Sequence, residues 1–146
     1  MGDCLSLLSL IKDEFSCEAV DVRTYSPLTL AFVGDCVFDL IIRTVVVGRG
    51  NRATNGLHKT KSAIVKAQTQ AEMIEVLLPE LSPEEESVYR RGRNAKSYTT
   101  AKNASIGDYR KATGLEALIG YLYLQDDMDR VLYLVKKGLQ EKGLEI

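Results

Sequence analysis

The chain has 146 residues, 45% of them hydrophobic, and a formal net charge of −1 at pH 7. This length and apolar content fit one compact domain, and the nearly neutral charge by itself indicates no acidic partner. Three cysteines without CxxC spacing and a single histidine argue against a zinc site or a disulfide framework and fit a reducing cytoplasm, while three charged residues inside the most apolar run, 31–47, argue against a membrane span.

Six helices are predicted in chain order, with short connections between them. The first is amphipathic, because apolar residues recur at helical spacing at Leu5, Leu7, Leu8, Ile11 and Phe15. Ser26-Pro27 supplies a capping residue and a first-turn proline for a second helix over about 27–47. That helix is apolar around most of its circumference, so we expect it to be central and buried. A third helix is expected over about 56–78, ending before Pro79.

The second half of the chain continues the helical pattern. Ser82-Pro83-Glu84-Glu85 predicts a capped fourth helix to about Arg91. The stretch 91–105 is polar and basic and contains Gly92 and Asn94, so at least part of it is expected to be loop. Ser105 to Asp108 resembles a capping box that opens a fifth helix to about Leu124, and a last helix is expected over about 126–138. Together these elements predict one all-α domain over residues 1–146.

Charge is segregated along this chain. Residues 51–66 carry four basic side chains and no acid, residues 67–89 carry six glutamates and no base, and residues 90–111 carry seven basic side chains against one aspartate. The two basic segments could form a local surface for phosphate and ribose hydroxyls, through which A-form RNA is read mostly by its shape; alternatively, they are simply solvated. The candidate RNA-binding residues are Lys59, Lys61, Lys66, Arg90, Arg93, Asn94, Lys96 and Lys102.

Two carboxylates stand inside apolar helices. Burying an isolated carboxylate costs several kcal/mol unless it is paired, protonated or bound to metal. Asp35 shares a helical stripe with Asp39 and Arg43, at i, i+4 and i+8, and the plain alternative is a solvated stripe with an Asp39–Arg43 pair. Glu116 lies in the second such helix, where Gly120, four residues on, would let another helix approach closely.

Two acids from two packed helices could hold one Mg²⁺. This ion takes oxygen ligands, keeps several waters, and uses one or two protein carboxylates together with substrate phosphate. It can supply a hydroxide nucleophile and stabilise charge at phosphorus during hydrolysis. Helical periodicity leaves open the alternative that Asp35 and Glu116 each pair with an arginine or lysine.

These motifs resemble the ribonuclease III catalytic domain, and specifically its compact Mini-III branch. The family's first motif, roughly Glu-Phe-Leu-Gly-Asp-Ala-Val-Leu-Glu, is matched by residues 31–39, which read Ala-Phe-Val-Gly-Asp-Cys-Val-Phe-Asp. The second, roughly Asp-x-x-Glu-Ala-Leu-Ile-Gly-Ala-x-Tyr-Leu, is matched by residues 113–124. The likeness covers about residues 22–140, and the two motifs have the expected order and separation.

The resemblance implies a dimeric helical fold in which Phe32 is buried across the subunit interface. It implies that Asp35 and Glu116 are the catalytic, metal-binding carboxylates, with Mg²⁺ as cofactor and Mn²⁺ as a substitute. The implied reaction cuts double-stranded RNA to 5′-phosphate and 3′-hydroxyl ends, in the maturation of large-subunit (23S) ribosomal RNA. A ribosomal protein is a further candidate partner.

Two departures from the family pattern leave alternatives open. Ala31 stands where most of the family has glutamate, and Thr113 stands where the second motif opens with aspartate. The sequence also ends before the double-stranded-RNA-binding domain that usually follows, so the segments 51–66 and 90–103 are expected to grip the substrate. The main hypothesis is an Mg²⁺-dependent endoribonuclease. A non-catalytic double-stranded-RNA-binding relative associated with the ribosome is the second, and a helical interaction module with ordinary ion pairs is the third.

Overall fold

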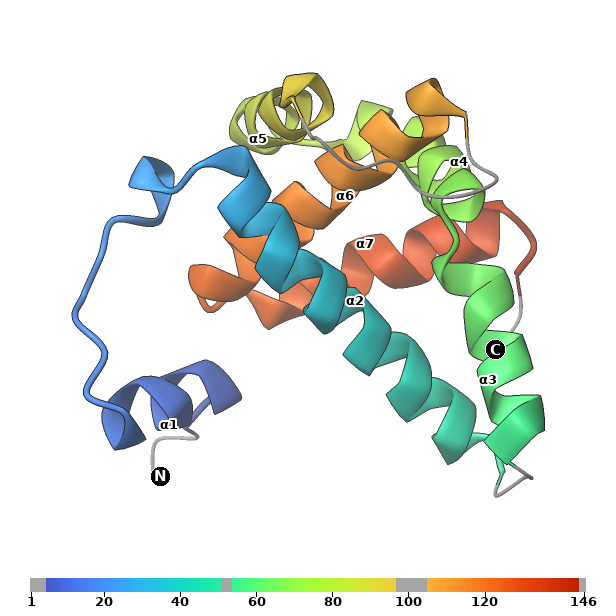
Figure 1. Cartoon of the computed structure of the whole chain (residues 1–146), viewed down its shortest axis with the longest axis horizontal. Helices are drawn as coiled ribbons and strands as arrows, with labels where there is room; N and C mark the ends of the chain where they lie inside the picture. The colour runs from blue at the N-terminus through green and yellow to red at the C-terminus, as the bar shows by residue number, and fades with distance from the viewer. Residues whose placement is uncertain (1–4, 51–53, 97–104, 145–146) are drawn as a thin grey trace.

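A computed structural model describes residues 5–50, 54–96 and 105–144, and within these ranges every regular element is a helix (Figure 1). The all-α prediction is confirmed. No described helix has the length and apolar character needed to cross a membrane. In chain order the elements are α1 Leu7–Glu14, η1 Val22–Thr24, α2 Pro27–Gly48, α3 Thr54–Val65, α4 Ala67–Leu77, η2 Leu78–Glu80, α5 Pro83–Asn94, α6 Ile106–Leu124 and α7 Met128–Glu141.

Helix α6 is the centre of the fold. It packs against α2, α4, α5 and α7 (Figure 1). Nearly every side chain from Ala112 to Leu122 is buried. The α2–α6 contact is the most extensive, and Phe38 and Ile42 of α2 are fully covered there. The expectation that α2 is central and buried therefore holds for the face toward α6. Its opposite face exposes Phe32 and Leu40.

Three predicted helix starts are confirmed. The Ser26 hydroxyl accepts a hydrogen bond from the Thr29 backbone N–H at 3.2 Å, and Pro27 follows in the first turn. At α5, the Ser82 hydroxyl accepts from Glu85 N–H, and the Glu85 carboxylate accepts from Ser82 N–H in return. Before α6, the Ser105 hydroxyl accepts from Asp108 N–H at 3.0 Å. Each bond satisfies a backbone donor that the first helical turn leaves unpaired.

The single third helix predicted over 56–78 is wrong. The chain breaks at Lys66, whose backbone is extended with φ −66° and ψ 153°, so that α3 and α4 are separate helices. The break turns the chain and lets α3 pack on α2 while α4 packs on α6 and α7. Other boundaries shift by a few residues: α5 extends to Asn94, and the last helix runs Met128–Glu141.

Helix α1 stands apart from the other helices and joins them through a long, mostly irregular connection (Figure 1). Its cap residue Ser6 donates a hydrogen bond from its hydroxyl to Asp126 Oδ2, at 2.9 Å, in the turn between α6 and α7. Leu8 is the one buried residue of this helix. The first helix is therefore amphipathic, as predicted, but most of its apolar side chains lie outside the core.

Candidate active site

The two acid-bearing helices meet backbone to backbone. A Cβ added to Gly34 of α2 would lie 1.7 Å from the carbonyl oxygen of Glu116, and one added to Gly120 of α6 would lie 1.9 Å from the carbonyl oxygen of Leu30. Only residues without a side chain fit such a crossing. The close approach expected at Gly120 is therefore present, and it depends equally on Gly34.

This crossing brings Asp35 and Glu116 together. Asp35 follows Gly34 on the exposed side of α2, whereas Glu116 is partly buried on α6. The pKa of the Glu116 carboxyl is raised to about 9, first because burial disfavours its charged form, and then because of a hydrogen bond with Asp35 and the negative charge of Asp35. In the absence of a cation, Glu116 therefore holds a proton at neutral pH.

No cation of the described residues neutralises this pair. Within those residues, neither Asp35 nor Glu116 forms an ion pair with arginine or lysine. Asp39, one turn along α2, is different: it accepts a hydrogen bond from Arg43 Nε at 2.8 Å and lies 3.4 Å from Lys61 Nζ. The solvated ion pair weighed as an alternative thus exists at Asp39, but not at Asp35.

The positions of the two missing family carboxylates are occupied by small buried residues. Ala31 lies one turn before Asp35, and Thr113 lies one turn before Glu116 with its hydroxyl donating to the Tyr109 carbonyl at 3.0 Å. Within the described residues, no cluster of three or more acidic, histidine or cysteine side chains could hold a metal. Two carboxylates can still bind a hard divalent cation whose other ligands are water and phosphate oxygens.

One group of candidate RNA-binding residues lies at the end of α5, which packs on the same helix that carries Glu116. Gly92 of α5 packs directly on α6, where an added Cβ would lie 2.8 Å from the Ala117 Cβ and 3.0 Å from the Gly114 Cα. Glu116 belongs to the same turn of α6. Arg93, Asn94 and Lys96 follow Gly92, so they lie at the end of a helix that packs on the turn of α6 bearing Glu116.

The side chains of this group differ in how they are held. The Arg93 guanidinium lies 5.7 Å from the centre of the Tyr89 ring, and its Nε donates to Asn94 Oδ1 at 3.2 Å. Arg90 forms an ion pair with Glu86. Lys96 is exposed and, within the described residues, has no acidic partner. Lys102 lies outside the described residues.

The second group lies on α3 and at the α3–α4 break. Lys61 is partly buried and is held by Asp39, which places it one turn of α2 away from Asp35. Lys59 is exposed on α3, and exposed Lys66 lies at the break itself. The Lys61–Asp39 contact has no signal in the sequence, because the two residues are far apart along the chain and each could equally be a solvated surface charge.

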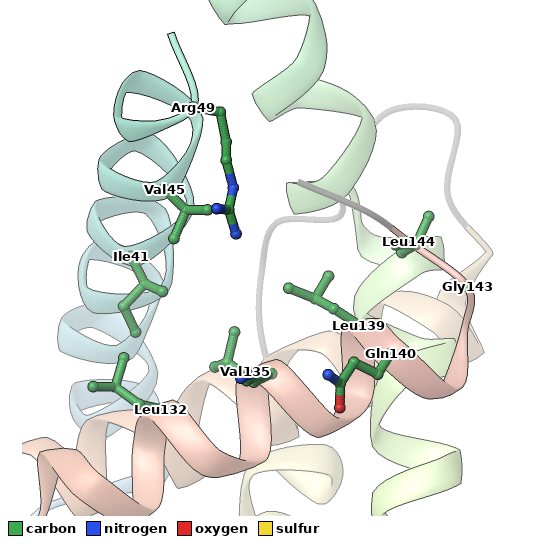
Figure 2. A pocket seen from close by; sticks show the side chains of 10 residues that line it. Ile41, Val45, Arg49, Leu132, Val135, Leu139, Gln140, Gly143 and Leu144 are labelled. Atoms are coloured by element: carbon green, nitrogen blue, oxygen red, sulfur yellow. The ribbon is translucent and has the colours of Figure 1, made fainter.

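Phe32, the expected interface residue, is 82% exposed on α2. Leaving so large an aromatic side chain in water forgoes the free energy that its burial would provide. A hollow of about 630 Å³ lies elsewhere, between α2 and α7. Figure 2 shows side chains that line it, among them Ile41, Val45, Leu132 and Leu139, with Arg49 at its edge. It contains neither carboxylate.

Comparison with known proteins points to one family. Residues 28–127 match the model of the ribonuclease III domain. The chain is 46% identical to a Mini-ribonuclease 3 of Thermoanaerobacter sp., over 82% of this chain and 84% of that protein, and 44% identical to one of Clostridium tetani, over 80% and 78%. A crystal structure of a protein from Fusobacterium nucleatum aligns with a TM-score of 0.75 at 28% identity, covering 85% of this chain and 99% of that one.

Proposed function

The chain belongs to the Mini-ribonuclease 3 family and is an endoribonuclease of ribonuclease III type, and from this premise we propose that it cuts double-stranded RNA with Mg²⁺ held by Asp35 and Glu116. The observation that carries the proposal is the contact of these two carboxylates across the Gly34–Gly120 crossing, with no arginine or lysine of the described residues beside them. Maintaining two acids in such a place is costly unless a cation compensates them.

The donor set fits a hard divalent metal. Both side chains offer oxygen ligands, and one exposed and one partly buried carboxylate leave room on the outer side for water and a phosphate oxygen. When bound, Mg²⁺ (or Mn²⁺ in its place) would lower the pKa of a coordinated water and stabilise charge at phosphorus. Glu116 would have to release its proton to bind the ion. The Asp35 carboxylate would supply the second protein oxygen ligand.

Substrate binding is assigned to the basic residues on the two sides of the carboxylate pair. Arg93, Asn94 and Lys96 lie at the end of α5, which packs on the turn of α6 bearing Glu116, and Lys61 of α3 is paired with Asp39, one turn from Asp35. Contacts with phosphate and ribose position a duplex without reading its sequence. Lys59, Lys66 and Arg90 would extend this surface, as would Lys102 beyond the described residues.

The oligomeric state, compartment and natural substrate are proposed from membership of the family. We propose that the enzyme is a cytoplasmic homodimer, with Phe32 in the interface, so that each protomer cuts one strand and leaves 5′-phosphate and 3′-hydroxyl ends. Cys17 and Cys36 are exposed free thiols in the part of the chain that the structure describes, which fits a reducing compartment. The proposed substrate is precursor large-subunit ribosomal RNA, presented with the help of a ribosomal protein. Cleavage of that precursor, with and without ribosomal proteins, tests this part of the proposal.

The central experiment incubates the purified chain with a long RNA duplex, with and without Mg²⁺. We expect cleavage that requires the metal, and its loss in Asp35→Asn and in Glu116→Gln. Asp39→Asn is the matched control: it removes an acid of the same stripe that already has two basic partners, so metal-dependent cleavage should be reduced less than by either other variant.

Folding and binding must be measured beside activity. Asp35→Asn and Glu116→Gln should keep a cooperative thermal transition and bind duplex RNA with little change in affinity. Duplex binding without cleavage in either Mg²⁺ or Mn²⁺ would contradict the catalytic proposal. Unfolding of both variants would instead mean that the two acids are structural.

A further inference from the structure

The large hydrophobic side chains that the fold leaves exposed are concentrated in two places. Thirteen such residues are exposed in the described part of the chain. Six of them lie in residues 5–20, which include α1, and four lie on α2. We call residues 5–20 the N-terminal arm, and the exposed α2 residues Leu28, Phe32, Leu40 and Val47 the α2 stripe. Apolar surface gathered in this way usually marks an interaction site.

The arm is attached to its own protomer only weakly. The Ser6 hydroxyl donates a hydrogen bond to Asp126 in the α6–α7 turn, and Leu8 is buried. The other large apolar side chains of α1, Leu7, Leu10 and Ile11, are exposed, as is Phe15 just beyond its end. Most of the apolar surface of α1 is therefore uncovered within the described part of the chain.

An isolated helix of this length needs a partner. Helices shorter than about 12–15 residues are marginal in water without tertiary packing, and α1 has eight residues with one of them buried. The arm also lies outside residues 28–127, which match the ribonuclease III domain, so its contacts are not part of that shared domain.

The charge of the arm argues against a membrane surface and against RNA as its binding partner. Residues 5–20 carry one lysine against two glutamates and one aspartate, which gives a net charge of −2. An anionic membrane surface and the phosphates of RNA both attract basic rather than acidic segments. A protein surface rich in apolar side chains is the partner that fits.

We propose that the arm of each protomer packs its apolar face onto the α2 stripe of a second copy. The inference rests on the dimer of the proposed function and extends the interface outward from Phe32. A two-fold axis makes each arm–stripe contact twice, so one association covers both exposed apolar surfaces of both chains. The α1–α2 connection, residues 15–26, is long enough for α1 to stand beside a neighbouring protomer while remaining attached to its own.

The test measures the dimer dissociation constant of the full-length chain by sedimentation equilibrium. Leu7→Asp with Ile11→Asp should raise it by at least about 100-fold, because two apolar contacts are replaced by two charges. The cooperative thermal transition of the helical domain should persist. The control is Ile106→Asp with Leu132→Asp, which makes the same change at two exposed positions outside the arm and the stripe, and should leave dimerisation unchanged.

Cross-linking locates the contact. With Cys4 replaced by serine, a chain that keeps only Cys17 is mixed with a chain that keeps only Cys36, both of them exposed thiols. A bismaleimide should give a product joining Cys17 of one chain to Cys36 of the other. The inference would be overturned if the native chain were monomeric, or if the arm variant dimerised normally. It would also be overturned if the control weakened the dimer equally, or if the mixed product did not form.

Cleavage assays separate this inference from the proposed function. An arm-dependent dimer that cuts no RNA duplex would refute the nuclease proposal and leave the arm contact standing. An enzyme that cuts RNA duplexes but whose dimer does not depend on the arm would refute the arm contact and leave the nuclease proposal standing.

Discussion

The carbonyl oxygen of Glu116 occupies the place that a side chain on Gly34 would need, 1.7 Å from the added Cβ. The atoms in the way are backbone atoms of α6, including the Gly120 nitrogen at 2.8 Å, and cannot rotate aside. This contact sets the separation of α2 and α6, and with it the separation of the Asp35 and Glu116 carboxylates.

Gly34→Ala should therefore lower stability and activity together. Forcing the helices apart should cost roughly 3 kcal/mol or more, which corresponds to a fall of about 10 °C in the melting temperature. Cleavage should be lost even at temperatures where the variant remains folded, because the two carboxylates separate. Gly107→Ala is the control, since an added Cβ meets nothing within 4 Å there. Equal melting temperatures for both variants would contradict the crossing as described.

Stability in the absence of metal should depend on pH through Glu116. Its pKa is about 9 in the folded chain against 4.5 as the ordinary value, so the folded state binds this proton more tightly than the unfolded state does. Stability from this group is complete below pH 4.5 and is lost as pH rises toward 9, by an amount on the order of a few kcal/mol.

Urea unfolding from pH 5 to 9 checks this expectation. The native chain should lose stability relative to Glu116→Gln as pH rises, because glutamine cannot ionise. Added Mg²⁺ should raise the stability of the native chain most at high pH, where Glu116 is ionised and able to bind the ion. Native and Glu116→Gln curves that stay parallel over this range would show that Glu116 is not held protonated.

Much of the fold follows from local signals in the sequence. Ser26-Pro27 and Ser82-Pro83 mark the starts of α2 and α5 because a serine cap and a first-turn proline act within a few residues of each other. The break at Lys66 has no such signal: no glycine or proline is present, and the Lys66 side chain makes no capping hydrogen bond. The chain turns there because α3 and α4 pack on different helices, which is a non-local cause.

The candidate site shows the same division. An acidic residue inside an apolar helix can be recognised in the sequence, so Asp35 and Glu116 can be predicted as candidate metal ligands. Their contact depends on Gly34 meeting a carbonyl group some eighty positions away, which periodicity cannot reveal. The same limit hides the second role of Glu85, which caps α5 as the sequence indicates and is also buried against Arg130.

The Glu85–Arg130 pair should hold α5 to α7. Arg130 Nε and Nη2 donate to the two Glu85 carboxylate oxygens, each at 2.8 Å, and the Glu85 side chain is 8% exposed. Arg130→Met should cost about 3 kcal/mol, because a buried carboxylate loses its partner. Glu85→Gln combined with Arg130→Met should recover much of that loss. Arg23→Met is the control, because its ion pair with Asp21 is exposed.

The same pair should add acid sensitivity. The hydrogen bonds from Arg130 hold the pKa of Glu85 below its ordinary value of 4.5. Its contribution to stability is therefore present above pH 4.5 and is lost as pH falls through the lowered value. Chemical denaturation of the native chain and the double variant at pH 7 and pH 3 measures this: the difference between them should shrink at pH 3, and a constant difference would count against the pair.

RNA affinity should depend most on basic side chains that no acid already holds. Lys96 is exposed and Arg93 lies against an aromatic ring, whereas Arg90 is paired with Glu86. Lys96→Ala and Arg93→Ala should each weaken duplex binding and lower the slope of log affinity against log salt by about 1. Arg90→Ala should do less, because its charge is already partly neutralised.

Binding is best measured without divalent metal, at several salt concentrations and with two duplexes of unrelated sequence. Phosphate contacts carry little sequence information, so Lys96→Ala should weaken both duplexes to the same extent. Lys137→Ala on α7, whose charge is paired with Glu141 at 3.2 Å, provides a matched loss of one lysine elsewhere on the surface and should leave the slope unchanged. If Lys137→Ala and Lys96→Ala lowered affinity equally, the attraction would come from overall charge rather than from the end of α5. The end of α5 would then not be part of the RNA-binding surface.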